Sequence, residues 1–213
     1  MSSTPRKTNN AKGTQSKRAL ILLDRHGIMR TRELVAGGVA ATTLSRMEKD
    51  GIIQRLSRGL YQRSDAATDI NHDLAEAAKR VPKGVICLTS ALAFHELTDQ
   101  IPHRIWLAIG AKDWQPSDNG PSLRIIRLTQ TLLQRDIQTH MIDGVPVRIF
   151  NIPRTLVDCF RFRKSVGLSV AVEALRDALK TRRTTAAEIA DRAHQSGSWT
   201  IIRPYLEAYT IDG

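Results

Sequence analysis

Two successive glycines, Gly37-Gly38, limit how the first third of this chain can fold, because they form a turn between two stretches with helical spacing. Residues 32–36 predict a short helix before the turn, and residues 39–49 predict a second helix after it. Residues 52–63 then alternate between apolar and polar around an arginine-glycine pair, which predicts a β-hairpin. Helix, glycine turn, helix and hairpin in this order indicate a winged helix-turn-helix over residues 17–65, an arrangement that places one helix in a DNA major groove.

Polar segments flank this predicted domain. Residues 1–16 contain almost nothing apolar to bury, and we expect them to form a disordered basic tail. A first helix is predicted over residues 17–26, with Gly27 ending it. Residues 64–69 are small and polar, which is typical of a linker, so a second domain is predicted over residues 70–213.

Several side chains of the predicted motif are candidates for contact with DNA. The helix over 39–49 begins with short side chains that let its backbone approach a groove, and Arg46 is long enough to reach a guanine edge or a phosphate. Arg58 at the hairpin tip is placed for a phosphate or minor-groove contact. An ordinary solvated face is the alternative interpretation of Arg46 and Lys49. The complete predicted set is Arg30, Thr31, Ala41, Thr42, Thr43, Ser45, Arg46, Lys49, Arg55, Arg58, Gly59 and Arg63.

Positive charge is concentrated in the same region. Residues 1–65 carry 13 Lys+Arg against 5 Asp+Glu, whereas residues 66–213 carry 19 against 16. A concentration of this kind attracts nucleic acid, because each phosphate contact releases condensed counterions. The formal net charge of +11 alone is compatible with a merely basic proteome. Its coincidence with the helix-turn-helix pattern favours double-stranded DNA as the partner.

Residues 70–213 mix predicted helices and strands, which indicates an α+β domain. The clearest signal is Asp143-Gly144, a two-residue hairpin turn between predicted strands 137–142 and 145–150. Pro153 then occupies the first turn of a predicted helix. The other expected elements are helices over 73–80, 89–97, 168–180, 184–194 and 200–209, and strands over 104–109 and 123–128. The whole chain is therefore predicted to be α+β.

Cysteine usage and hydropathy point to the cytoplasm. Cys87 and Cys159 lie in apolar surroundings, where buried free thiols are expected rather than a disulfide. The polar, basic N-terminus has no apolar run long enough for a signal peptide. No run approaches the roughly 20 residues of a membrane span, so no membrane partner is expected.

Catalytic and metal-binding patterns give little support to an enzyme, and no cofactor or metal is predicted. Residues 95–99 begin like a zinc-protease helix but end in Asp99 instead of histidine. A nuclease would need carboxylates such as Asp99, Asp113 and Asp118 near strand ends, but no partner lysine and carboxylate follow at suitable spacing. Residues 184–190 resemble the first half of a second helix-turn-helix, although such spacing is more typical of a core helix.

These residues together resemble the AbiEi-type antitoxins of bacterial abortive-infection, or type IV toxin–antitoxin, systems. The resemblance runs from about Arg18 to Tyr209. The segments that carry it are Gly38–Met47, Asp50-Gly51-Ile52, Arg58-Gly59-Leu60-Tyr61, Thr89–His95 before Pro102, and Ile152–Asp158. One departure is Ala40, where family members often have serine or threonine at the start of the recognition helix. A missing cap of this kind costs about 0.5–2 kcal/mol of helix stability.

The resemblance implies two roles and no enzymatic activity. The winged domain would bind operator DNA and repress the protein's own operon. The C-terminal antitoxin domain would neutralise a cognate nucleotidyltransferase-like toxin, without a stable complex between the two being required. The alternative left open is a stand-alone winged-helix regulator with a C-terminal ligand-sensing domain.

Overall fold

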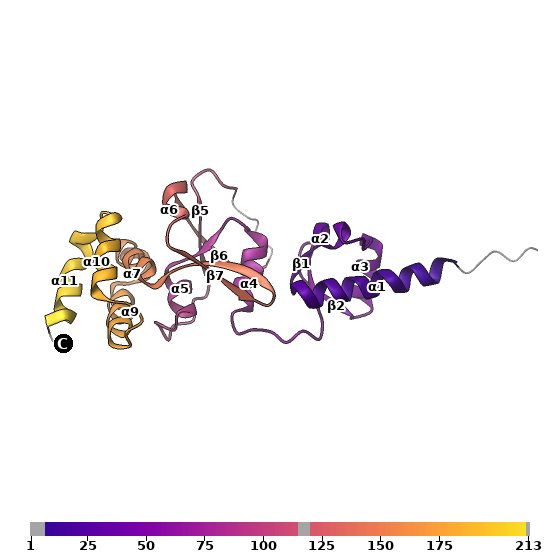
Figure 1. Cartoon of the computed structure of the whole chain (residues 1–213), viewed down its shortest axis with the longest axis horizontal. Coiled ribbons are helices and arrows are strands. Elements are labelled where there is room, and N and C mark those ends of the chain that lie inside the picture. The colour runs from indigo at the N-terminus through magenta and orange to yellow at the C-terminus, as the bar shows by residue number, and fades with distance from the viewer. Residues whose placement is uncertain (1–6, 115–119, 212–213) are drawn as a thin grey trace, which may run out of the picture. The chain divides into compact units, whose positions relative to one another are not determined.

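The computed structural model describes residues 7–114 and 120–211 and combines helices with sheets, in agreement with the α+β prediction (Figure 1). The chain forms two compact units. Of the described residues, the first unit takes 7–82, 120–121 and 141–146, and the second takes 83–114, 122–140 and 147–211. The first unit thus includes a helix at 72–80 and the turn at 143–144, which the sequence placed in the second domain. His72 Nδ1 lies 2.6 Å from Asp143 Oδ2 and joins these two pieces.

The N-terminal part of the first unit joins helices to an antiparallel sheet with the strand order β1-β3-β2. Its elements are α1 (Lys7–His26), β1 (Met29–Arg30), α2 (Thr31–Ala36), α3 (Ala41–Lys49), β2 (Ile53–Ser57) and β3 (Leu60–Arg63), and α4 (His72–Arg80) follows. Helix, turn, helix and hairpin therefore occur in the predicted order. Leu34, Leu44, Met47 and Ile53 are each at most 1% exposed and pack with Leu23 of α1 into one core.

Helix α1 begins at Lys7, so residues 7–16 are helical where a disordered tail was expected. Residues 1–6 lie outside the described part of the chain. The local sequence gave no sign of this extension, because 7–16 lack the apolar stripe by which a packed helix is predicted. Near the end of this extension, the Gln15 side chain reaches the start of α3.

The turn between α2 and α3 requires glycine at Gly38. Its φ of +83° lies in the left-handed region, which amino acids with a Cβ atom rarely adopt. A Cβ atom there would also lie 2.5 Å from Nη1 of Arg18 on α1. The glycine turn predicted from the sequence is thus explained by the backbone conformation, since the nearby Arg18 guanidinium is the end of a flexible side chain that could move.

A mixed sheet with the strand order β6-β5-β4-β8-β7 occupies the middle of the chain. Its strands are β4 (Val85–Ile86), β5 (Ile105–Gly110), β6 (Leu123–Leu128), β7 (Ile137–Ile142) and β8 (Val145–Phe150). Strands β5 and β6 run parallel in a register from Ile105↔Leu123 to Gly110↔Leu128, and β4 pairs antiparallel with β5 and parallel with β8. Asp143 and Gly144, at φ of 46° and 71°, form the predicted two-residue turn between β7 and β8.

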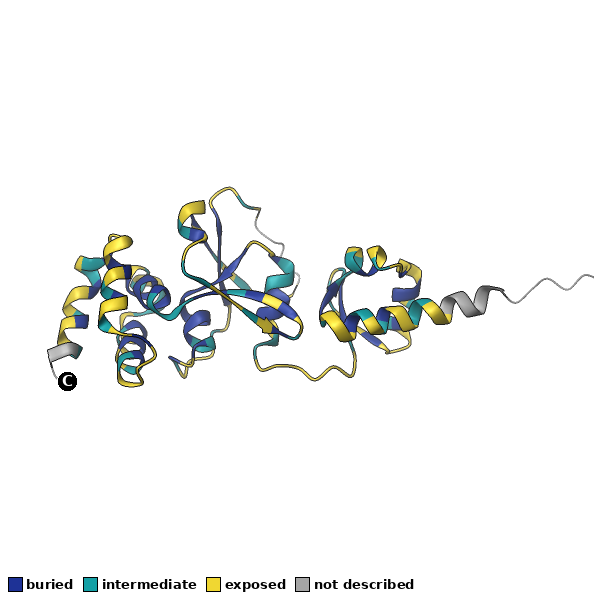
Figure 2. Cartoon of the chain, viewed as in Figure 1, coloured by how far each residue is buried: buried dark blue, intermediate teal, exposed yellow. Residues whose placement is uncertain are grey.

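Helices of the second unit cover a continuous apolar core. They are α5 (Leu88–Phe94), α6 (Gln130–Leu133), α7 (Ile152–Arg161), α8 (Arg163–Val166), α9 (Leu168–Lys180), α10 (Ala186–Gln195) and α11 (Trp199–Ile211). Helix α7 begins after Asn151, whose side chain accepts from the Arg154 N–H, and it packs against α5, α9, α10 and α11. Helices α9 to α11 show both buried and exposed residues along their length (Figure 2). Ile189 and Ala193 of α10 are buried in this core, as the non-DNA interpretation of residues 184–190 expects.

Two arginines and two aspartates form an ionic cluster inside the second unit. Arg154 and Asp158, both 0% exposed, lie one turn apart on α7, and Arg154 Nε donates to Asp158 Oδ2 at 2.5 Å. Arg192 of α10 is 4% exposed, and its Nη1 lies 3.0 Å from Asp136 Oδ2. Burial raises the pKa of Asp158, while the neighbouring Arg154 opposes that rise. The cluster joins α7, α10 and the loop before β7, and Asp136 lies partly exposed at its edge.

Both cysteines are free thiols and are buried, as predicted. Cys87 and Cys159 are each 0% exposed in the core of the second unit. Burial raises the pKa of both thiols, which disfavours the reactive thiolate.

His95, directly after α5, is a buried titratable group held by the sheet. It is 5% exposed, and its Nε2 donates to the backbone oxygen of Phe150 at 2.8 Å. Burial lowers the pKa of His95, and the charges of His140 and Arg183 lower it further. The unfolded chain therefore binds this proton more readily than the folded protein does.

We expect the free energy of unfolding to decrease as the pH falls below about 6.5, the ordinary histidine value. The contribution of His95 is fully present above that pH and is lost as the pH falls through the lowered pKa. His95→Gln keeps a donor for Phe150 but cannot titrate, so its unfolding free energy should change less between about pH 7 and 5. Urea unfolding of both proteins at several pH values measures this, and an equal pH dependence would contradict the assignment.

Candidate nucleic-acid interface

Helix α3 buries one side and presents the other to solvent. Leu44 and Met47 are each 1% exposed and pack into the N-terminal core. Residues three and four positions apart share one side of a helix, and five of the other positions of α3 form such a stripe, while the acidic Glu48 is partly buried. The stripe consists of Ala41, Thr42, Ser45, Arg46 and Lys49, all exposed except the partly buried Arg46. These five predicted residues therefore lie on one surface.

Thr43 does not belong to that surface. It is 5% exposed, and its Oγ1 donates to Oε1 of Gln15 at 2.8 Å. The Thr43 side chain is therefore turned away from the surface on which the prediction placed it. Helical periodicity alone places position 43 near the edge of the apolar side, and the polar contact with α1 turns it inward.

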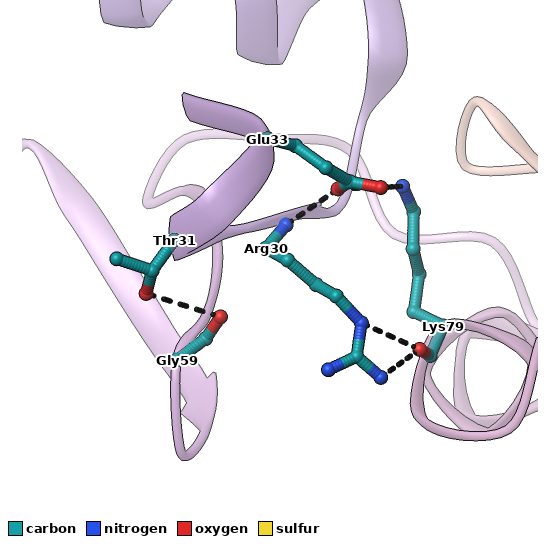
Figure 3. A network of polar contacts seen from close by, with 5 residues as sticks. All are labelled: Arg30, Thr31, Glu33, Gly59 and Lys79. Carbon is teal, nitrogen blue, oxygen red and sulfur yellow. Dashed lines mark hydrogen bonds and ion pairs between the residues drawn. The ribbon is translucent and has the colours of Figure 1, made fainter. Parts of the chain in front are cut away.

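Thr31 and Gly59 hold the tip of the β2–β3 hairpin against the start of α2 (Figure 3). The backbone N–H of Thr31 donates to the Gly59 oxygen at 2.9 Å, and its hydroxyl reaches the same oxygen at 3.3 Å. The hydroxyl of Thr31 thus supports the hairpin instead of pointing to a partner. This contact leaves the Arg58 side chain exposed at the tip, and Arg55 is exposed on β2.

Arg30 is engaged inside the first unit, although it was predicted to contact DNA. Its guanidinium donates through Nε and Nη2 to the backbone oxygen of Lys79 on α4 (Figure 3). Its backbone N–H donates to Glu33 Oε2 at 2.6 Å, and Lys79 Nζ lies 3.0 Å from the same oxygen. Burial alone would raise the pKa of Glu33, but these two hydrogen bonds lower it overall. This network therefore holds the guanidinium of Arg30 against α4.

Arg63 is also committed to neighbours within the chain. Its Nη1 lies 2.6 Å from Asp24 Oδ1, and its Nη2 lies 2.6 Å from Asp65 Oδ2. The hydrogen bonds of Asp65 and Asp24 raise the pKa of Arg63. Two carboxylates offset its charge, so Arg63 contributes less to an anion-binding surface than the sequence suggests.

The remaining four cations of the predicted set are open in the sense that they form no ion pair within the described residues; Arg46 is partly buried and the other three are exposed. Among the described residues, no carboxylate forms an ion pair with Arg46, Lys49, Arg55 or Arg58. Arg55 makes only a long contact, from Nε to the Ser57 oxygen at 3.4 Å. The α3 stripe and the β2–β3 hairpin thus each present positive charge that no described carboxylate pairs, which suits a phosphate backbone.

Gln15 and Arg18 of α1 also shape this surface, and the sequence analysis missed both. Gln15 Oε1 accepts from the backbone N–H of Ala40 at 3.2 Å as well as from Thr43. The guanidinium of Arg18 covers Gly38. No local signal predicts these contacts, because the Gln15 partners lie 25 and 28 positions away along the chain.

Of the acidic residues considered for a nuclease, Asp99 and Asp113 lie in the described part of the chain and form no metal-binding cluster there. Asp99 is exposed, and Asp113 Oδ2 accepts from the Gly110 N–H at 2.9 Å. Asp118 lies outside the described residues. Over 7–114 and 120–211, no three His, Cys, Asp or Glu side chains are grouped so that they could hold a metal ion. The same residues include no helix of the length and apolar character that spanning a bilayer requires.

Comparison with known families identifies the domain that carries this surface. Residues 17–64 match the family described as "Transcriptional regulator, AbiEi antitoxin". This segment is therefore similar to an AbiEi-type antitoxin domain. The matched segment includes the Gly37-Gly38 turn, α3 and the β2–β3 hairpin. It begins after Gln15 and ends before α4, so the AbiEi-type domain coincides with the N-terminal core and its exposed basic surface.

A solved structure shares the fold beyond the AbiEi-type domain. The crystal structure of the RV2827C protein from Mycobacterium tuberculosis matches with a TM-score of 0.61 at 15% identity. The match covers 92% of this chain and 77% of that chain. At this identity the likeness concerns the fold alone. No curated protein gave a significant match to the chain.

Proposed function

We propose that this protein is the antitoxin of a type IV toxin–antitoxin system and represses its own operon. In this proposal the N-terminal domain is a winged helix-turn-helix that binds double-stranded operator DNA. The observation that carries it is the surface on α3 and the hairpin, where Arg46, Lys49 and Arg58 are open to a partner. Small side chains at Ala41 and Ser45 leave room for the helix to approach base edges. The AbiEi match over residues 17–64 supports the same role.

The C-terminal part of the chain would then act on the toxin. We infer that the domain predicted over residues 70–213 neutralises a nucleotidyltransferase-like toxin encoded beside this gene. Support comes from the family description, which joins regulation and antitoxin activity, and from the resemblance of Ile152–Asp158 to the family pattern. Co-expression tests this role: the full chain should relieve growth arrest by the neighbouring gene product, and continued arrest would contradict it.

Specific DNA binding is tested by a salt-titrated gel-shift assay on the DNA just upstream of the gene, with an unrelated fragment as competitor. We expect preferential binding of the upstream fragment that weakens steeply with salt. If the four open cations each contact a phosphate, the slope of log K against log salt should be about −3 to −4 for one chain. Equal and weak binding to both fragments would show that the basic N-terminus is only a nonspecific anchor, and would contradict the repressor.

A further inference from the structure

The start of α3 has no cap of its own. Ala40 occupies the N-cap position in an extended conformation, with φ of −67° and ψ of 144°, and carries no side-chain oxygen. The first N–H groups of a helix have no partner within it, and a serine or aspartate at this position normally accepts from one of them. The proposed DNA-contacting stripe begins at the next residue, Ala41. A frayed start would therefore disorder the part of α3 that enters the groove.

A side chain from α1 supplies a substitute. Gln15 Oε1 accepts from the Ala40 N–H at 3.2 Å and from Thr43 Oγ1 at 2.8 Å. In a capping box, a glutamate or glutamine at the third helical position accepts from the N-cap N–H. Here the third position is Thr43, and Gln15 provides the acceptor from a different helix. One turn further along α1, Arg18 covers Gly38, so α1 holds both the turn and the start of α3.

We propose that Gln15 is a positioning residue for DNA binding. Its side-chain oxygen ties the N-terminal turn of α3 to α1 and fixes the orientation in which the stripe meets DNA. The inference rests on the proposed function and assigns a role to a residue outside the AbiEi match of 17–64. Thr43 is the other half of the tie. Since Thr43 is 5% exposed, its side chain is not placed to contact DNA directly.

The test compares full-length variants on the upstream DNA by fluorescence anisotropy. Gln15→Ala and Thr43→Val should each weaken binding about three- to thirty-fold, the range set by the loss of a helix cap. The double variant should bind no more weakly than the weaker single variant, because both changes remove the same contact. Gln195→Ala, which alters an exposed glutamine at the end of α10, is the matched control and should bind like the wild type.

A rescue variant separates positioning from direct contact. Ala40→Ser places a hydroxyl at the N-cap, where the extended backbone suits it. In the Gln15→Ala background, Ala40→Ser should restore most of the lost affinity. Hydrogen exchange of the amides of residues 40–44 in the free protein should accelerate in Gln15→Ala and slow again in the rescued variant.

The outcomes distinguish this inference from the proposed function. If the wild type binds the operator and Gln15→Ala binds equally well, with unchanged exchange, Gln15 does not position α3 and the inference fails alone. Weak binding by Gln15→Ala, combined with normal Thr43→Val and no rescue by Ala40→Ser, would show direct DNA contact by Gln15 and would also overturn it. If the wild type does not bind specifically, the proposed function fails, and the exchange data then decide the tie between α1 and α3.

Discussion

Replacing Asp158 with alanine should lower the free energy of unfolding of the second unit by about 3–5 kcal/mol, the cost of leaving a buried charge without its partner. Arg154 and Asp158 are both 0% exposed, and their side chains meet at 2.5 Å. The next carboxylate, Asp136, lies 4.0 Å from Arg154 Nη1 and already faces Arg192. The guanidinium of Arg154 also lies over the Phe150 ring, 4.8 Å from its centroid, and the Arg154 residue is fully buried.

The measurement is denaturant unfolding followed by tryptophan fluorescence. All three tryptophans, Trp106, Trp114 and Trp199, lie in the second unit, so the signal reports on that unit. Asp191→Ala on the exposed side of α10 is the matched control and should change stability by less than about 0.5 kcal/mol.

A double variant tests the physical reason. Removing both charges, as in Arg154→Met with Asp158→Leu, should be less costly than Asp158→Ala alone, since no ion is then left uncompensated. A loss below about 1 kcal/mol for Asp158→Ala would show that Arg154 finds water or another anion, and would contradict the buried pair.

The elements with strong local signals were predicted with nearly their observed bounds. The Gly37-Gly38 turn, the hairpin around Arg58-Gly59, and strands β6, β7 and β8 all follow from turn residues and alternation that lie within a few positions of each other. Strands β1 and β4 were missed because each has only two residues, too few to show a period. The start of α1 was missed because it lacks an apolar stripe.

In the candidate site too, features that depend on local sequence could be predicted, and contacts between distant residues could not. Exposure of the stripe on α3 could be predicted, because it depends on the periodicity of one helix. The internal contacts of Arg30, Thr43 and Arg63 could not be predicted, because the fold brings their partners close from distant positions in the sequence. Lys79 lies 49 positions from Arg30, and Asp24 lies 39 positions from Arg63. Sequence reasoning identified cations in the right region but could not tell which of them the protein itself neutralises.

The cations that the protein itself does not neutralise give the second prediction with a large effect, which concerns operator binding. Replacing Arg46 and Arg58 together with alanine should weaken operator binding by about 100-fold near physiological salt, because each contact is worth on the order of 1–3 kcal/mol. Losing the phosphate contact of Arg58 should also reduce the salt slope by about 1. Arg46 and Arg58 have no ion-pair partner among the described residues, so the fold should remain intact.

The control must remove the same charge from a different surface. Arg176→Ala with Lys180→Ala takes two cations from exposed positions on α9 and should leave specific binding nearly unchanged. If both double variants weakened binding equally, the effect would come from net charge, and α3 would not be the recognition element. If the Arg46 and Arg58 double variant bound like the wild type, neither α3 nor the hairpin tip would contact DNA. A selective loss in that variant alone would show that DNA meets the surface formed by α3 and the hairpin, where the fold leaves positive charge unneutralised.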